Sequence, residues 1–362
     1  VPTNPDACGS YALEIKPQIE QLFVNCRSGM SAEVFERRLY VARRRSEKAL
    51  AESDPAFYIP TLSSRVIGYK GLVMPALLPV FYPDLEDDRF ASSLAVYHQR
   101  FSTNTWPEWR LAQPFRYLAH NGEINTLQGN RNWARAREHK FASEHIVNMD
   151  DIRPIVSMTG SDSFSMDNML EGLAMGGAGL FRSLRLMVPP AWQNVSSMDA
   201  DLRAFYEYTS MHMEPWDGPA GIVLTDGRYA GCALDRNGLR PARYVVTRDR
   251  YLTVASEVGV WDYQPEDVIA KGRLKPGQII AVDTTSGELL LPDHIDERLK
   301  KRQPYRHWLK EHARQLESTL SGDGSQTGSL DEPRMAVYQK MFGVTFEERD
   351  QVLSVLAEAG QE

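Results

Sequence analysis

The chain has 362 residues, of which 42% are hydrophobic and 25% charged, a composition typical of one large or two ordinary globular domains. Its net charge of −7 gives no support to nucleic-acid binding, and its longest apolar runs, such as 279–282, are too short to span a membrane. Three widely spaced cysteines (Cys8, Cys26 and Cys232) argue against a disulfide framework and form no zinc-binding pair, so we expect a cytoplasmic protein without a bound metal.

Three helices and one strand are predicted before residue 180. Ser31 is a typical N-cap for the first helix, and Gly176-Gly177 is a typical stop for the third. The apolar residues of Ser93–Phe101 predict a buried strand that ends near Arg100. The helices are expected over 31–52, 129–141 and 161–174.

The region from 218 to 261 and beyond changes to β structure. Asp226-Gly227 between two apolar runs is a strong hairpin signal, and further turns are expected at 248–249 and 286–287. Strands joined by such short turns are antiparallel, so the sequence predicts an α+β layered domain rather than a doubly wound one. The strands are expected over 220–225, 228–234, 243–247, 251–256, 278–283 and 288–291.

The carboxy-terminal part is predicted to be separate from this domain. A helix is expected over 299–315, and the Ser- and Gly-rich stretch 318–329 is typical of a flexible linker. Thr345 to Glu348 fits a capping box at the start of a short helical unit, with Gly360 as a plausible stop. We therefore divide the chain into a main domain at 1–300, a helix and linker at 301–330, and the start of another domain at 331–362.

Four polar residues form a candidate ligand site. Arg100, after the predicted strand, could grip a carboxylate with two parallel hydrogen bonds. Asn121 and Gly122, expected in a loop, could direct an amide and a backbone N–H at one oxygen, as in an oxyanion hole. Asp162, beside a predicted helix start, could receive an ammonium. The ordinary alternatives are a structural salt bridge, an Asn-Gly turn and a helix cap. We expect all four to line one cleft that holds an amino acid.

Several strings in this order resemble one family. They include His-Gln-Arg-Phe-Ser-Thr-Asn-Thr at 98–105, Ala-His-Asn-Gly-Glu-Ile-Asn-Thr at 119–126 and Thr-Gly-Ser-Asp-Ser at 159–163. The chain resembles the glutaminase domain of bacterial glutamate synthase, a class II glutamine amidotransferase, over essentially its whole length. The other matching strings are at 111–116, 188–194, 213–220, 234–243 and 256–263.

The resemblance implies a fold and a reaction. The fold would be that of the N-terminal-nucleophile hydrolases, a four-layer αββα sandwich, incomplete here at its amino terminus. The reaction would release ammonia from L-glutamine for the amination of 2-oxoglutarate to L-glutamate. Arg100 would bind the glutamine carboxylate, Asp162 its α-amino group, and Asn121 with Gly122 the oxyanion.

The resemblance also implies partners and cofactors outside these residues. The partners would be the remaining domains of the large subunit and an electron-donating small subunit, with no nucleic acid and no membrane. FMN and an iron–sulfur cluster are expected in the carboxy-terminal domains, and no cofactor in this chain.

The family nucleophile is a cysteine at the mature amino terminus, and this chain begins with Val1. Cys8-Gly9 resembles the expected dipeptide, but the sequence after it does not resemble the family's glycine-rich opening strand. Residues 1–4 and 17–25 instead resemble a stretch downstream of the nucleophile. We therefore expect the nucleophile upstream of Val1, and no glutaminase activity from the chain as given.

Two other functions fit part of the pattern. The chain could belong to another class II amidotransferase, such as those that make phosphoribosylamine, glucosamine phosphate or asparagine. It could also be a non-catalytic glutamine-binding or interaction module. The long insert between Asp162 and Asp217 and the Glu-Pro-Trp-Asp string at 214–217 favour glutamate synthase over the other amidotransferases.

Overall fold

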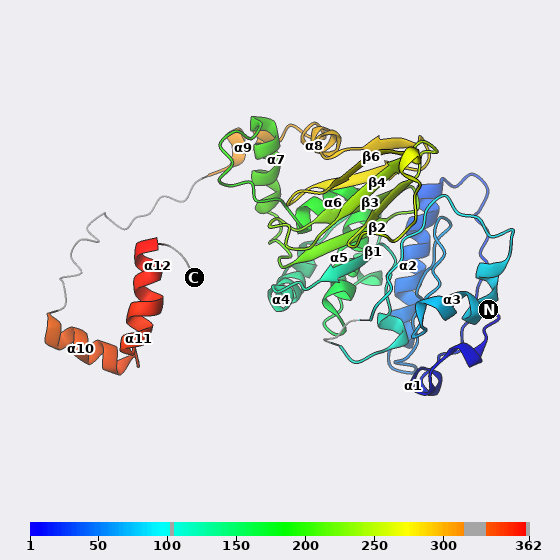
Figure 1. Cartoon of the computed structure of the whole chain (residues 1–362), viewed down its shortest axis with the longest axis horizontal. Helices are drawn as coiled ribbons and strands as arrows, with labels where there is room; N and C mark the ends of the chain where they lie inside the picture. The colour runs from blue at the N-terminus through cyan, green and yellow to red at the C-terminus, as the bar shows by residue number, and fades with distance from the viewer. Residues whose placement is uncertain (102–104, 315–330, 360–362) are drawn as a thin grey trace. The chain divides into compact units, whose positions relative to one another are not determined.

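The computed structural model describes residues 1–101, 105–314 and 331–359, in two compact units, residues 1–311 and 312–362 (Figure 1). The predicted linker at 318–329, Gly360 and the middle of the string at 98–105 lie outside the described residues. No helix in the described ranges is both long and apolar enough to cross a bilayer.

Two antiparallel sheets form the centre of the first unit. The larger sheet has the order β1-β2-β3-β7-β8, so β1 is an edge strand, and the smaller has the order β5-β4-β6. The predicted hairpin at Asp226-Gly227 joins β2 to β3 and is confirmed. The strands are β1 (Leu118–Gly122), β2 (Ala220–Thr225), β3 (Tyr229–Leu234), β4 (Arg243–Thr247), β5 (Leu252–Ala255), β6 (Val268–Arg273), β7 (Ile279–Asp283) and β8 (Glu288–Leu290).

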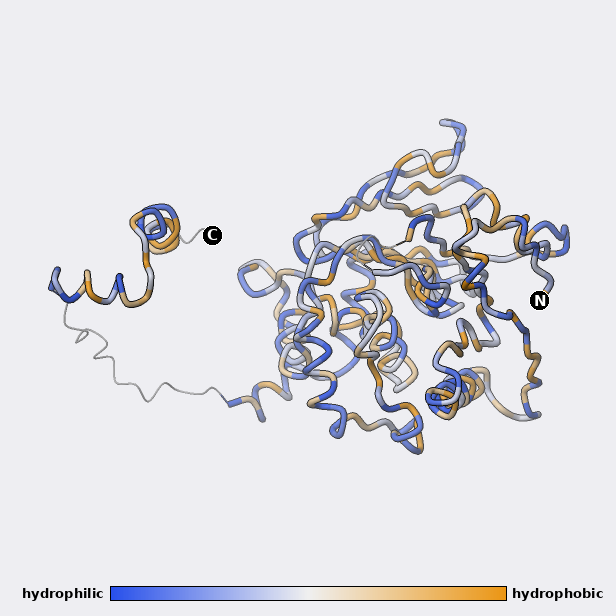
Figure 2. Tube along the Cα trace, turned by 90° about the horizontal axis from the view of Figure 1, so that it is seen from below, coloured by the Kyte–Doolittle hydropathy of each residue, from blue (hydrophilic) through white to orange (hydrophobic). Residues whose placement is uncertain are grey.

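The alternation of side chains along the larger sheet separates two hydrophobic layers. Leu118, Ile222 and Ile279 belong to a core that they share with the helices, whereas Cys232 and Ile280 pack with residues of the smaller sheet. One face of the larger sheet is therefore covered by helices and the other by the second sheet, and Figure 2 shows hydrophobic residues gathered inside this unit. The helices are α1 (Ser10–Glu14), α2 (Ala32–Leu50), α3 (Leu78–Phe81), α4 (Leu127–Arg137), α5 (Asp162–Leu173), α6 (Leu180–Met187), α7 (Ala200–Ser210), α8 (Pro292–Lys300) and α9 (Tyr305–His312).

The six strands predicted after residue 218 and two predicted helix caps are confirmed, whereas one predicted strand and one predicted helix are not. Ser31 and Ser161 cap α2 and α5, with side chains that accept from the N–H groups of Val34 and Phe164. The predicted strand at 93–101 is wrong, because its described residues form no ladder and mostly lie at the surface. The expected helix over 299–315 is divided into α8 and α9, which are separated at 301–304 by a turn that contains Pro304.

Two strands were missed by the sequence prediction. Asn121 and Gly122, expected in a loop, are the last two residues of β1 and pair with Gly221 and Ala220 of β2. The other is β6, which pairs with β4 although its residues are mostly exposed. The Asn-Gly turn considered as an alternative for residues 121–122 is therefore wrong.

The second unit is a short helical segment. It contains α10 (Glu332–Met341), α11 (Phe346–Glu348), a π-helical turn (Arg349–Leu353) and α12 (Ser354–Ala359). The Thr345 side chain accepts from the Glu348 N–H at 3.1 Å, so the predicted helix start is confirmed. Val352 and Leu356 of the predicted apolar stripe are 49% and 41% exposed.

Gly122 lies where two chain segments cross closely. It has φ +143°, and a Cβ there would overlap the carbonyl oxygen of Pro219. Gly122→Ala should therefore lower the free energy of unfolding by at least about 2 kcal/mol, because it adds both backbone strain and a steric clash. Urea unfolding would measure this. As a control, Gly129→Ala on the exposed surface of α4, where a Cβ has open space, should stabilise by up to about 1 kcal/mol. Equal stability of the two variants would contradict the expectation.

Candidate active site at the edge of β1

The register of β1 determines which of its backbone groups face the open edge of the sheet. Thr225 N–H donates to Tyr117 O at 2.8 Å and Glu123 N–H to Pro219 O at 2.9 Å. Because the direction of hydrogen bonds alternates along an antiparallel strand, Leu118, His120 and Gly122 direct their N–H groups away from β2. The Leu118 N–H donates a hydrogen bond to Asp167 Oδ1 at 3.1 Å, and the His120 N–H donates one to Gln113 Oε1 at 2.7 Å.

Gly122 and Asn121 each have a donor that meets no acceptor among the described residues. The Gly122 N–H points off the same edge, and no acceptor for it occurs in the part of the chain that the structure describes. The Asn121 side chain is half-buried and likewise makes no hydrogen bond to a described residue. Its neighbour on the same face, Ala119, pairs with Val223, which packs toward the smaller sheet. The end of β1 thus carries an amide and a backbone N–H that have no partner among the described residues.

Asp162 approaches β1 from the helix side. It is the first residue of α5, while Ser161 is the N-cap, so the cap considered for Asp162 belongs to its neighbour. Its Oδ2 accepts from the Ile124 N–H at 2.8 Å and its Oδ1 from the Ser163 N–H at 2.6 Å. The side chain stays 20% exposed, and a carboxylate oxygen can accept a second hydrogen bond. The Asn121 side chain lies on the other face of β1. One ligand could therefore contact both the Asp162 carboxylate and the Asn121 amide only along the outer edge of the strand.

The segment that carries Arg100 lies along this edge. The His98 ring interacts with the backbone of His120, and the Arg100 N–H donates to His98 Nδ1 at 3.3 Å. Burial lowers the pKa of His98, against the smaller opposite effect of these backbone contacts. The Arg100 side chain is exposed and forms no ion pair with any described residue, so the salt bridge considered as its alternative is not found there.

Two residues without a predicted role hold the site's framework. Arg131 of α4 is buried, and its guanidinium donates to Gly160 O at 3.0 Å, to Thr159 O at 3.2 Å and to Ser165 Oγ. Gln113 bonds both backbone groups of His120. The sequence offered one signal, since Arg131 lies in a helix with no acidic residue three or four positions away.

Below the site, a buried ion network joins α2, α5 and the residues before β1. Glu171 Oε2 accepts from Arg43 Nη2 at 2.6 Å and from Arg116 Nε at 2.9 Å. Burial acts to raise the pKa of Glu171, but Arg116 and Arg43 outweigh it and hold the pKa below its usual value. Burial raises the pKa of Asp167, one helical turn earlier, to about 6, although Asp167 accepts from the N–H groups of Tyr117 and Leu118.

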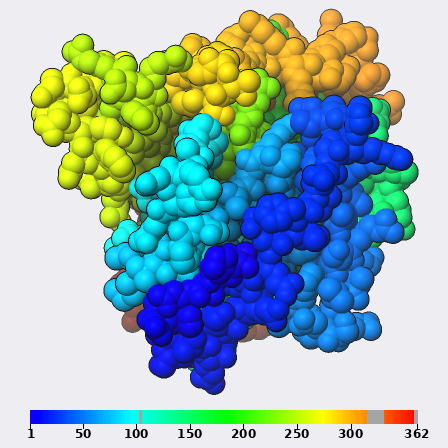
Figure 3. Space-filling model, turned by 90° about the vertical axis from the view of Figure 1, so that its right-hand side faces the viewer, coloured from blue at the N-terminus to red at the C-terminus, as the bar shows by residue number. Residues whose placement is uncertain are grey.

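None of the three cysteines is placed as an activated nucleophile. Cys8 packs beside a cluster that contains Phe81 and Trp109. The amino-terminal segments cover one face of this unit (blue to cyan in Figure 3). Burial raises the pKa of the Cys8 thiol, and it raises that of Cys232, inside β3, to about 12. Cys26 is exposed and lies against carbonyl oxygens of its own turn. A reactive cysteine needs the opposite effect, a lowered pKa.

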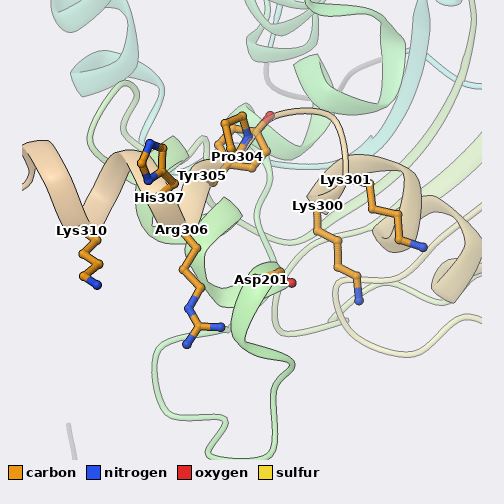
Figure 4. A pocket seen from close by; sticks show the side chains of 8 residues that line it. All are labelled: Asp201, Lys300, Lys301, Pro304, Tyr305, Arg306, His307 and Lys310. Carbon is orange, nitrogen blue, oxygen red and sulfur yellow. The ribbon is translucent and has the colours of Figure 1, made fainter.

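A hollow of about 570 Å³ lies elsewhere, between α7, α8 and α9 (Figure 4). It is lined by basic side chains, including Lys300 and Lys301, and by none of the predicted site residues. Lys300 pairs with Asp199 and Glu297, and Lys301 pairs with Glu297. These carboxylates neutralise much of the positive charge, so the hollow gives little indication of a separate anion site.

Comparison with known proteins places the chain in a family. Residues 1–308 match the model of the class II glutamine amidotransferases. The whole chain is 41% identical to the glutamate synthase [NADPH] large chain of Bacillus subtilis and 42% identical to that of Azospirillum brasilense. It is also 41% identical to the ferredoxin-dependent glutamate synthase 2 of Synechocystis.

The matches cover different shares of this chain and of its relatives. The comparisons cover 100% of this chain but only 24%, 24% and 23% of these three relatives, so the chain spans about a quarter of their length. The family model covers most of the first unit, including β1, α5 and the residues around them. The chain therefore belongs to the class II glutamine amidotransferases.

Proposed function

We propose that this chain is the glutamine-hydrolysing, ammonia-producing part of a glutamate synthase large chain. The observation that carries the proposal is a pair of donors at the end of β1, the Gly122 N–H and the Asn121 amide, that have no partner in the described ranges. They occur in a chain that is similar to glutamate synthases along its full length. The ammonia would aminate 2-oxoglutarate to L-glutamate in another part of such an enzyme.

The four site residues would divide the recognition of L-glutamine. Arg100 would bind the α-carboxylate, because it is exposed in the segment that contacts β1 through His98 and has no acidic partner among described residues. Asp162 would bind the α-ammonium with the remaining acceptor capacity of its carboxylate. The side-chain amide oxygen of glutamine would lie between the Asn121 amide and the Gly122 N–H.

This arrangement fits the chemistry of an acyl transfer. A thiolate attacks the amide carbon, and the negative charge that develops on the oxygen is stabilised by the two donors. The C–N bond then breaks, ammonia leaves with a proton from the catalytic base, and water hydrolyses the thioester to glutamate. From the family resemblance we propose that the nucleophile is an amino-terminal cysteine whose own α-amino group is the base.

The same assignment extends to the fold and to the rest of the enzyme. The two packed sheets would be the centre of the αββα sandwich, and residues 1–300, 301–330 and 331–362 would be the amidotransferase domain, a connecting segment and the start of a central domain. FMN, the iron–sulfur cluster and the electron-donating subunit would belong to other parts of the enzyme, in the cytoplasm.

Glutamine binding tests the proposed site. Asp162→Asn should weaken glutamine binding roughly tenfold to a hundredfold, because a charge-assisted hydrogen bond to the substrate ammonium is worth about 1.5–3 kcal/mol. Calorimetric titration with L-glutamine would measure the change. Asp249→Asn, in an exposed turn, is the matched control and should bind as the unmodified chain does.

In the full-length enzyme, Asp162→Asn should raise KM for glutamine more than it lowers kcat. It should leave ammonium-dependent glutamate formation intact, because that reaction bypasses the glutaminase site. If Asp162→Asn binds glutamine with unchanged affinity, Asp162 does not bind the substrate and its assignment is wrong. An unmodified chain that binds no glutamine would contradict the proposed function itself.

A further inference from the structure

His120 connects the two sides of the proposed site. Its backbone lies in β1, next to Asn121, while its ring is 1% exposed on the helix side of the strand. Nδ1 lies 3.0 Å from Ser163 Oγ and 3.8 Å from Asp162 Oδ2. The residue before the proposed oxyanion donors therefore contacts the proposed ammonium acceptor.

The hydrogen bonds around Ser163 determine where the imidazole proton lies. Ser163 Oγ is 3.1 Å from Asp162 Oδ1, and a carboxylate can only accept, so the single hydroxyl proton goes to Asp162. When the hydroxyl proton lies in that hydrogen bond, Ser163 Oγ accepts from His120 Nδ1–H, so the neutral imidazole carries its proton on Nδ1. Its Nε2 is buried.

The surroundings favour this neutral form. Burial is the largest effect and lowers the pKa of His120, while Asp162 of α5 acts to raise it. His98 from the 98–101 segment and Arg240 from the turn before β4 lower it further. A hydrogen bond from the His120 ring to the backbone carbonyl of Pro219, before β2, acts to raise the pKa. An added proton would lie beside the Asp162 carboxylate, the group that the substrate ammonium needs.

We propose that neutral His120, acting through Ser163, orients Asp162 for the α-ammonium of the amino-acid substrate, and that a proton on His120 competes with that ammonium. The proposal rests on the proposed function, because it concerns how the same site selects its ligand. His120 is thus a positioning residue, and it sets an acid limit for glutamine binding.

The experiment compares the pH dependence of two ligands. L-Glutamine and glutaramate, which lacks the α-amine, are titrated calorimetrically into the unmodified chain, His120→Asn, Ser163→Ala and the control His139→Asn. Asn at 120 can donate to Ser163 from about the position of Nδ1 but cannot titrate. His139 is exposed and does not contact the site.

As the pH falls from 7 through the lowered pKa of His120, the unmodified chain and His139→Asn should lose roughly fivefold or more in affinity for glutamine relative to glutaramate. His120→Asn should lose this pH dependence, because the asparagine amide does not titrate. Ser163→Ala should bind glutamine roughly tenfold more weakly, with glutaramate unaffected, because Asp162 loses its oriented donor.

Two results would overturn the proposal. One is an acid-dependent loss of glutamine binding that persists unchanged in His120→Asn. The other is an equal loss for both ligands in His120→Asn and Ser163→Ala, which would show a general structural role. If the unmodified chain binds glutaramate but not glutamine, the assignment of Asp162 fails. If it binds neither, the proposed function fails, so the failures are distinguishable.

Discussion

Asn121→Ala is expected to lower the rate of glutamine hydrolysis about a hundredfold to a thousandfold in the full-length enzyme, with little change in KM. The Asn121 amide has no partner among the described residues, so its removal breaks no visible structural hydrogen bond. An oxyanion donor acts on charge that develops in the transition state, and loss of one donor typically costs about 2.7–4 kcal/mol in activation free energy. Steady-state kinetics with glutamine would measure it.

The ammonium-dependent reaction separates catalysis from folding in this prediction. Glutamate formation from ammonium salts should be unchanged in Asn121→Ala, because it does not use the glutaminase site. Asn132→Ala, on the exposed side of α4, is a control that should keep full activity with both nitrogen sources. If Asn121→Ala lowers the rates with glutamine and with ammonium salts to the same degree, the role of Asn121 is structural and the oxyanion assignment is wrong.

Glu171→Gln is expected to lower the free energy of unfolding by about 3 kcal/mol at neutral pH. Glu171 is 6% exposed and neutralises two guanidinium groups, of which that of Arg43 is 1% exposed and that of Arg116 is 11% exposed. Removal of one partner of a buried ion pair typically costs about 3–5 kcal/mol, because the remaining charge stays in a poorly solvated place. Chemical unfolding at pH 7 would measure the loss.

The loss should depend on pH in a defined direction. Since the pKa of Glu171 is held below its unfolded value of about 4.3, its contribution is complete above that pH and disappears as the pH falls through the lower folded value. The contribution of Asp167 to stability depends on pH in the opposite direction. Its pKa is raised to about 6, so its contribution is complete below about pH 3.9 and is lost as the pH rises through 6. The difference in the free energy of unfolding between wild type and Glu171→Gln reports the contribution of Glu171 alone, provided that Asp167 has the same pKa in both proteins.

A matched control exists on the same arginine. Glu47 also pairs with Arg43, at 2.8 Å, but is 21% exposed, so Glu47→Gln should cost less than about 1 kcal/mol. If Glu171→Gln and Glu47→Gln are equally stable, the buried network contributes no more than a surface pair. A stability difference for Glu171→Gln that stays constant down to strongly acidic pH would contradict the electrostatic explanation.

The sequence by itself determined the elements that depend on local chemistry. Ser31, Ser161 and Thr345 cap helices because a short hydroxyl can satisfy a free N–H at a helix start. Asp226-Gly227 forms the β2–β3 turn because glycine readily takes the positive φ of 86° found there. The ordered strings also indicated the family, since they are carried by residue identity alone.

Only the tertiary structure decided which segments became strands and which groups stayed free. Residues 93–101 have the composition of a strand but pair with no described strand, while the polar Asn121-Gly122 joined β1 because β2 lies beside it. The free N–H of Gly122 follows from the register with β2, and the contact of His120 with Ser163 and Asp162 from the packing of α5 against β1. Pairing and packing join residues about 40 to 100 positions apart, and no local pattern of residues encodes them.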